Sequence, residues 1–206
     1  MGLEKVRERS LYRVARLQNL SIVDMVFNLD AHFQASHKLD GASRLPVSVI
    51  NALLKCICQE FPRYKDKTLL PLSSHTLPDA RSGSVGDIEI LDGHGAVYKA
   101  YEIKHDIEID RALIETAKEQ LLSTTTKRYF ILSTKERADD FSTEIKDIRK
   151  SHGCEFIING VLSTVKYSLR YISDLNLFIS HYVDLVEKDS VIKREQKVRW
   201  NDIVLR

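Results

Sequence analysis

The order of apolar segments between residues 85 and 158 constrains the fold of this chain more than any other feature. Two short alternating segments, VGDIEIL and AVYKAYEIK, flank the turn sequence DGHG and predict a β-hairpin. The segments that follow predict a helix from about Glu108 to Leu122, a strand over Arg128–Ser133, a charged helix over Ala138–Ser151 and a strand over Cys154–Ile158. Strands that alternate with helices in this way predict an α/β fold, with a mixed sheet flanked by helices.

Further helices are expected on both sides of this core in the sequence. Apolar side chains recur at helical spacing in residues 3–36, from Val47 to Phe61, and from Val161 to at least Val186. Pro62 ends the second of these helices, and a short strand is expected at Thr68–Leu72. The chain therefore has helical additions before and after its predicted sheet.

Length and composition exclude several classes of protein. A chain of 206 residues can bury a core without disulfides, and its formal net charge of +2 gives no global basic field. The three cysteines, at positions 56, 58 and 154, have neither the number nor the spacing of a disulfide framework or a structural zinc site. The N-terminal sequence lacks the apolar region of a signal peptide, and no segment approaches the length of a membrane span. We expect a cytoplasmic protein that does not enter a membrane.

The hairpin carries charged residues whose positions are informative. If Asp92–Gly95 forms the turn and Leu91 lies opposite Ala96, alternate strand residues share a face of the sheet. Asp87, Glu102 and Lys104 then share one face with Ala100. The opposite face would carry mainly apolar side chains, namely Ile88, Ile90, Val97, Tyr101 and Ile103. A loop with an odd number of residues or a β-bulge would break this parity.

Two carboxylates and an ammonium group on one face suit a specific chemistry. Carboxylates on neighbouring strands are ligands that Mg²⁺ accepts together with water and phosphate oxygens. The Lys104 side chain could orient or help to deprotonate an attacking water, or offset charge at a scissile phosphate. The pattern thus favours phosphodiester hydrolysis. The alternative is a solvated sheet surface with cross-strand ion pairs.

These residues resemble the PD-(D/E)XK nuclease superfamily, whose best-known members are restriction endonucleases. The matching residues are Gly86-Asp87 and Glu102-Ile103-Lys104, with Val85 in the place of the family's nominal proline. The resemblance covers about residues 51–158 and implies a restriction-endonuclease-like core. It also implies that Asp87, Glu102 and the Ile103 carbonyl bind Mg²⁺, with Mn²⁺ as a substitute, and that Lys104 is the catalytic lysine.

Other residues are candidates for accessory roles. Many members of the family carry a glutamate on the helix before the sheet, a position that Glu60 could fill, and some carry a polar residue where Gln120 stands. For both side chains the alternative is an ordinary solvated position on a helix. The loop before Asp87 is well placed to touch DNA, and its candidate contacts are Arg81, Ser82 and Ser84. The basic C-terminal segment around Trp200 could also contact phosphates, or could be a solvated helix face or a subunit contact.

The expected function is that of a type II-like restriction endonuclease that cuts double-stranded DNA at a specific sequence, as part of a restriction–modification system. One active site per chain and two DNA strands to cut imply a homodimer. We expect a single nuclease domain over residues 1–206, with a helical N-terminal region (1–62), a catalytic core (63–160) and a helical C-terminal region (161–206). The alternatives are a structure-specific nuclease such as a Holliday-junction resolvase and a non-catalytic DNA-binding module.

Overall fold

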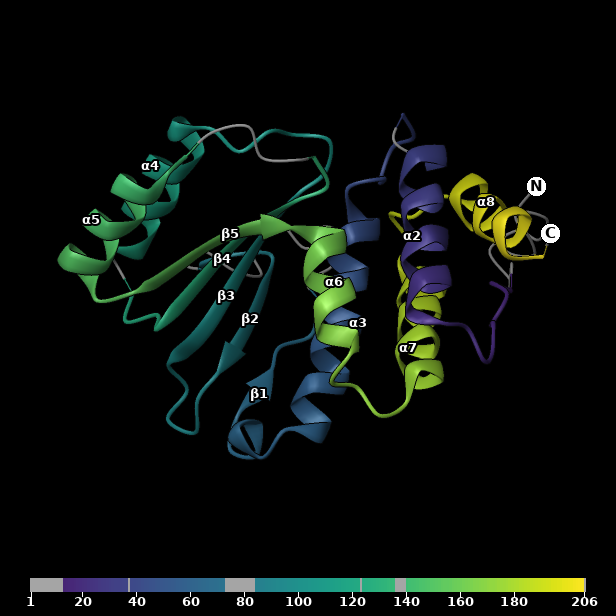
Figure 1. Ribbon diagram of the computed structural model, residues 1–206, viewed down its shortest axis with the longest axis horizontal. Coiled ribbons are helices and arrows are strands. Elements are labelled where there is room, and N and C mark those ends of the chain that lie inside the picture. The colour runs from purple at the N-terminus through teal and green to yellow at the C-terminus, as the bar shows by residue number, and fades with distance from the viewer. Residues whose placement is uncertain (1–12, 37, 73–83, 123, 136–139, 206) are drawn as a thin grey trace, which may run out of the picture.

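The computed structural model describes residues 13–36, 38–72, 84–122, 124–135 and 140–205. A five-stranded mixed sheet lies between helices that cover both of its faces, which confirms the predicted α/β class (Figure 1). The strands are β1 (Thr68–Leu69), β2 (Ile88–Leu91), β3 (Val97–Lys104), β4 (Arg128–Ser133) and β5 (Glu155–Gly160). The helices are α2 (Ile22–Ser36), α3 (Arg44–Glu60), the 3-10 helix η1 (Pro62–Tyr64), α4 (Arg111–Leu121), α5 (Ser142–His152), α6 (Val161–Leu169), α7 (Leu175–Lys188) and α8 (Arg194–Val204).

The strands follow one another across the sheet in chain order. β1, β2 and β3 pair antiparallel, whereas β3, β4 and β5 pair parallel. Parallel neighbours require a crossover connection, which α4 supplies between β3 and β4, and α5 supplies between β4 and β5. The sheet therefore combines a hairpin with two β–α–β units, as the order of apolar segments predicts.

Each face of the sheet packs against a different set of helices because side chains alternate along a strand. Ala100, Tyr129 and Ile131 belong to a core cluster with residues of α4 and α5. Tyr101 and Ile103 belong to the larger cluster formed with α3 and α6. In Figure 1, α4 and α5 lie on one side of the sheet, and α3 and α6 lie on the other.

A further helical layer lies beyond α3 and α6. Helix α7 packs against α3, while α2 contacts both α6 and α8 (Figure 1). Inside this layer the rings of His32, Tyr182 and Trp200 contact one another, and all three side chains are fully buried. The Trp200 indole N–H donates to the Ala15 carbonyl at 2.9 Å. Trp200 is thus a core residue and takes no part in a basic surface.

The predicted first helix is shorter than its apolar pattern suggests. Residues 3–12 lie outside the described part of the chain, residues 13–21 are not helical, and α2 begins at Ile22. Asn19 has a φ of 59°, a left-handed conformation that is not helical. Ser21 and Asp24 then cap the start of α2, with the Asp24 N–H donating to Ser21 Oγ.

The predicted C-terminal helix is two helices. The chain leaves helical geometry after Leu169, and Asp174 caps the start of α7 by accepting a hydrogen bond from the Leu177 N–H at 3.0 Å. An aspartate favours the N-cap because its side chain satisfies an amide that the first turn leaves unpaired. The apolar spacing continues through the break and therefore conceals it.

The hairpin register differs from the predicted one by two residues. Ile88 pairs with Tyr101 and Glu89 pairs with Ala100, whereas a bulge between Ile90 and Leu91 places Leu91 opposite Val97. A shift of two residues preserves the parity of the faces up to the bulge. Beyond the bulge the predicted assignment of faces is wrong. Val97 packs with the α4–α5 cluster, whereas the prediction placed it on the same face as Tyr101.

No helix in the described ranges is long and apolar enough to cross a membrane.

Candidate active site

Asp87 lies directly before β2, and Glu102 lies on β3. The pairing of β2 with β3 begins at Ile88 and Tyr101, and Asp87 and Glu102 are the residues next to that pair in each chain segment. The Asp87 Oδ2 atom accepts a hydrogen bond from the Ile103 backbone N–H at 2.8 Å. This bond fixes the carboxylate against the neighbouring strand.

Lys104 completes the predicted group. Its Nζ donates to the Glu102 Oε1 at 2.6 Å, and both side chains keep 24% of their surface exposed. Residues two apart on a strand point to the same face, so β3 itself positions this pair. The structure therefore brings Asp87, Glu102 and Lys104 together at the C-terminal end of β3, where solvent still reaches them.

The electrostatics of Glu102 reflect crowding of negative charge. Burial raises the pKa of Glu102, the neighbouring Asp87 carboxylate raises it further, and the hydrogen bond from Lys104 opposes the rise. Two carboxylates close enough to repel each other are stabilised by a bound cation. A bound cation would relieve this repulsion between Asp87 and Glu102.

The Ile103 carbonyl faces the same edge as the Asp87 carboxylate. The Lys104 carbonyl accepts from the Thr134 N–H, which follows β4. In a strand, the N–H and the C=O of one residue point to the same side, and those of the next residue point to the other side. Because the Lys104 carbonyl points toward β4, the N–H and the C=O of Ile103 both point toward β2. The N–H of Ile103 meets Asp87 there, and strand geometry turns the Ile103 carbonyl oxygen to the same side.

The oxygen donors of this site are of the type that Mg²⁺ accepts. Among the described residues, no group of three or more His, Cys, Asp or Glu side chains could hold a metal ion. A structural zinc site needs four such ligands, whereas Mg²⁺ is commonly bound by one or two carboxylates with water and phosphate oxygens completing its shell. Asp87 and Glu102 would supply the carboxylates, and Ile103 a carbonyl oxygen.

Two residues that lie next to the site were not predicted from the sequence. Glu89 is buried on the same face, and its Oε1 accepts from the Val85 N–H at 2.5 Å and from Ser84 Oγ at 3.0 Å. Tyr129 on β4 pairs with Ala100 of β3. Burial raises the pKa of Tyr129, and the charges of Glu102 and Asp87 raise it further. The alternation of side chains that places Asp87 and Glu102 on one face also places Glu89 there. The pairing of β3 with β4 places Tyr129 on that face as well.

The two accessory candidates have different positions. The Gln120 Oε1 accepts from the Tyr129 hydroxyl at 3.3 Å, so α4 brings Gln120 to the edge of the site. Glu60 lies at the end of α3, which packs on the opposite face of the sheet. Its carboxylate accepts from the N–H and the hydroxyl of Ser173. The structure does not bring Glu60 to the site, because its helix covers the other side of β3.

The loop candidates are only partly described. Arg81 and Ser82 lie outside the described residues. Ser84 is exposed, and its hydroxyl donates to the Gly86 carbonyl at 2.8 Å as well as to Glu89. Ser84 thus shapes the turn that leads into Asp87.

No protein-family model matches this chain, and a search of curated proteins found no match either.

Proposed function

We propose that this protein is a Mg²⁺-dependent endonuclease that hydrolyses phosphodiester bonds of double-stranded DNA, with the sequence specificity of a type II restriction enzyme. The observation that carries the proposal is the convergence of Asp87, Glu102 and Lys104 on one partly exposed face of the hairpin. The order of elements supports it, because a hairpin followed by α4 and a parallel β4 is the arrangement that the family resemblance implies.

Each residue has a distinct task in this proposal. Asp87 and Glu102 hold the cation, and the Ile103 amide keeps the Asp87 carboxylate oriented before substrate arrives. Bound Mg²⁺ would supply the Lewis acid that activates water and offsets charge on the phosphate. Lys104 stands beside Glu102 with an ammonium group that can orient the attacking water and stabilise the developing negative charge.

Cleavage of both strands also requires a second active site. The chain carries one such site, so we propose a two-fold homodimer that engages a palindromic sequence. A nick in one strand by an isolated subunit and a double-strand break by a dimer are distinguishable products.

The test is cleavage of phage DNA and supercoiled plasmid with Mg²⁺, with Mn²⁺ and with EDTA. We expect discrete fragments with either metal and none with EDTA. Asp87→Asn and Lys104→Met should each lower the rate by about a hundredfold or more, since single groups in acid–base or electrostatic catalysis contribute on that scale. The matched controls Asp106→Asn and Lys118→Met change exposed charges with surface ion-pair partners and should retain the wild-type rate.

The same assay separates the alternatives. Cutting of four-way junctions without fragments from phage DNA would replace the restriction function by a resolvase function. A folded protein that binds DNA but cuts neither substrate would be a binding module. Wild-type cutting by Asp87→Asn would refute the assigned active site.

A further inference from the structure

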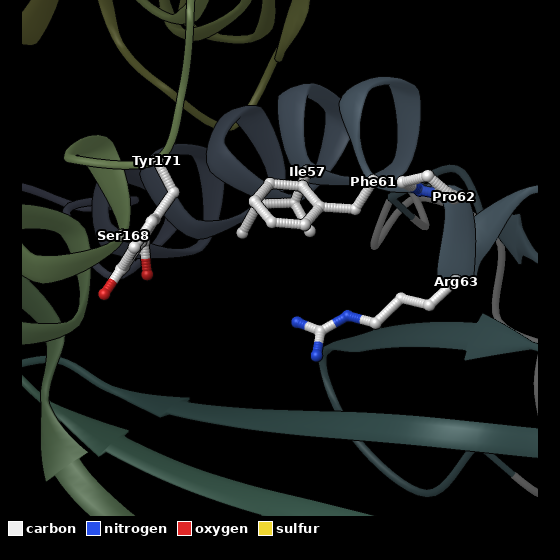
Figure 2. Close-up of a pocket in the computed structure, with 6 residues that line it drawn as sticks. All are labelled: Ile57, Phe61, Pro62, Arg63, Ser168 and Tyr171. Carbon is white, nitrogen blue, oxygen red and sulfur yellow. The ribbon is translucent and has the colours of Figure 1, made fainter.

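A pocket of about 460 Å³ lies on the opposite side of the sheet from Asp87. Its lining comes from the end of α3, from η1 and from the end of α6, and consists of Ile57, Phe61, Pro62, Arg63, Ser168 and Tyr171. Figure 2 shows the Arg63 side chain and the Phe61 ring at one side of this space, and Ser168 and Tyr171 at the other. The volume is within the range of small-molecule sites.

The pocket combines aromatic surface with a cation. The Arg63 guanidinium carbon lies 5.6 Å from the Phe61 ring centroid and 5.1 Å from that of Tyr64. Across the space, the Tyr171 side chain is 71% exposed, although Tyr residues usually bury much of their ring. Ser168 adds a hydroxyl on the same side as Tyr171. Such a surface can stack a planar ring and bind an anion at the same time.

Three cations lie at the Arg63 side of the pocket, namely Arg63 itself, Lys99 and Arg128. Lys99 is buried against the rings of Tyr64 and Tyr98, and both Arg63 and Arg128 are close enough to lower its pKa, after the larger effect of burial. The Glu60 carboxylate, next to Phe61 in sequence, is the nearby negative charge, and its oxygens accept hydrogen bonds from the N–H and the hydroxyl of Ser173. Cations gathered in a chain whose formal net charge is only +2 favour an anionic ligand at this place.

We propose that this pocket binds one nucleotide, with the base against Phe61 and Tyr171 and the phosphate at Arg63. The nucleotide is either free or one unit of a single-stranded nucleic acid, since both offer a planar base and a phosphate. This inference does not depend on the proposed nuclease activity, because none of the lining residues belongs to the Asp87 site and α3 and α6 cover the other face of the sheet.

The test uses the full chain in EDTA, so that cleavage plays no part. A fluorescein-labelled twelve-nucleotide oligothymidylate is titrated by anisotropy, and 2′-deoxyadenosine 5′-monophosphate by calorimetry. Arg63→Glu and Tyr171→Ala should each weaken binding about tenfold, because both a phosphate contact and a stacked ring contribute on that scale. Both side chains are exposed, and thermal melting checks that the variants fold.

Matched controls exclude general effects of charge and aromatic surface. Arg149→Glu reverses an exposed arginine on α5, and Phe27→Ala removes a ring on α2 that is 71% exposed, as Tyr171 is. Both controls should bind within about twofold of wild type, a change well below the effect of a stacked base.

The outcomes distinguish the two sources and can overturn the proposal. Binding of the monophosphate supports a free nucleotide, and binding of the oligonucleotide alone supports a single strand. The proposal fails if wild type binds neither probe, if either pocket variant binds as tightly as its control, or if inorganic pyrophosphate displaces the probe as well as a nucleotide does.

Discussion

At the scale of single residues, the Glu102 carboxylate lies between two charges of opposite sign. Asp87 raises the pKa of Glu102 and Lys104 lowers it, while burial raises it most. We therefore expect Asp87→Asn to lower the pKa of Glu102, and Lys104→Met to raise it. NMR titration of the side-chain carboxyl carbon of Glu102 measures both changes without any need for activity.

The control for this titration is Asp106→Asn, which removes an exposed carboxylate paired with Lys135. The pKa of Glu102 should not move in this variant. An unchanged value in Asp87→Asn would mean that the two carboxylates do not interact, and the metal assignment would then lose its electrostatic basis.

The grouping of Asp87, Glu102 and Lys104 was predictable because strand parity depends only on counting residues. The contacts of Glu89 and Gln120 were harder to predict. The Glu89 carboxylate binds the Val85 amide through a turn whose shape comes from the tertiary structure. Gln120 reaches Tyr129 only because α4 packs over that strand, and the position of a crossover helix along its sheet is set by packing.

At the scale of elements, Gly86 sets how closely the start of β2 approaches β3. A Cβ atom at this position would lie 2.7 Å from the Tyr101 backbone oxygen, closer than real Cβ atoms come. Gly86→Ala must displace one strand, which we expect to cost about 1–3 kcal/mol of folding free energy. Denaturant unfolding measures this loss. The displacement also moves Asp87, so DNA cleavage should fall along with stability.

Gly93 provides the comparison within the same hairpin. A Cβ atom there would meet its nearest neighbour, the Asp66 backbone oxygen, at 3.4 Å, which is an ordinary contact. Gly93→Ala should change stability by no more than about 0.5 kcal/mol. Equal losses in the two variants would show that the close approach at Gly86 does not control the hairpin.

Element types were predictable from periodicity, whereas element ends depended on local hydrogen bonds. The strand over Arg128–Ser133 has its predicted bounds because it is a continuous apolar segment in a parallel sheet. The helices that begin at Ile22 and Leu175 start where Ser21 and Asp174 cap them. Apolar spacing continues across both of these points, so the caps and not the spacing mark the boundaries.

At the scale of the whole molecule, one buried histidine connects three helices of the outer layer. His32 on α2 contacts the Tyr182 hydroxyl of α7 through Nδ1 at 2.7 Å and the Gln196 carbonyl of α8 through Nε2 at 2.8 Å. An Nε2–H that donates to the carbonyl leaves Nδ1 to accept from the hydroxyl, so the neutral ring satisfies both bonds. Protonation would add a second N–H opposite that hydroxyl and place a charge in the core.

This arrangement predicts that acid weakens the fold through His32. Burial lowers the pKa of His32 from 6.5 to about 4, so between these values the unfolded chain binds a proton that the folded chain does not. Stability is then complete above about pH 6.5 and falls by up to about 3 kcal/mol as the pH drops toward 4. His32→Asn removes this proton uptake, so its free energy of unfolding should decline less than that of wild type between pH 7 and pH 4.5. Denaturant unfolding of both proteins at the two pH values gives the comparison. Both proteins carry the same carboxylates, so the contribution of these groups to the decline in unfolding free energy cancels. Equal declines would show that the histidine ring is protonated as readily in the folded protein as in the unfolded chain, and that the contacts among α2, α7 and α8 do not depend on its neutral form.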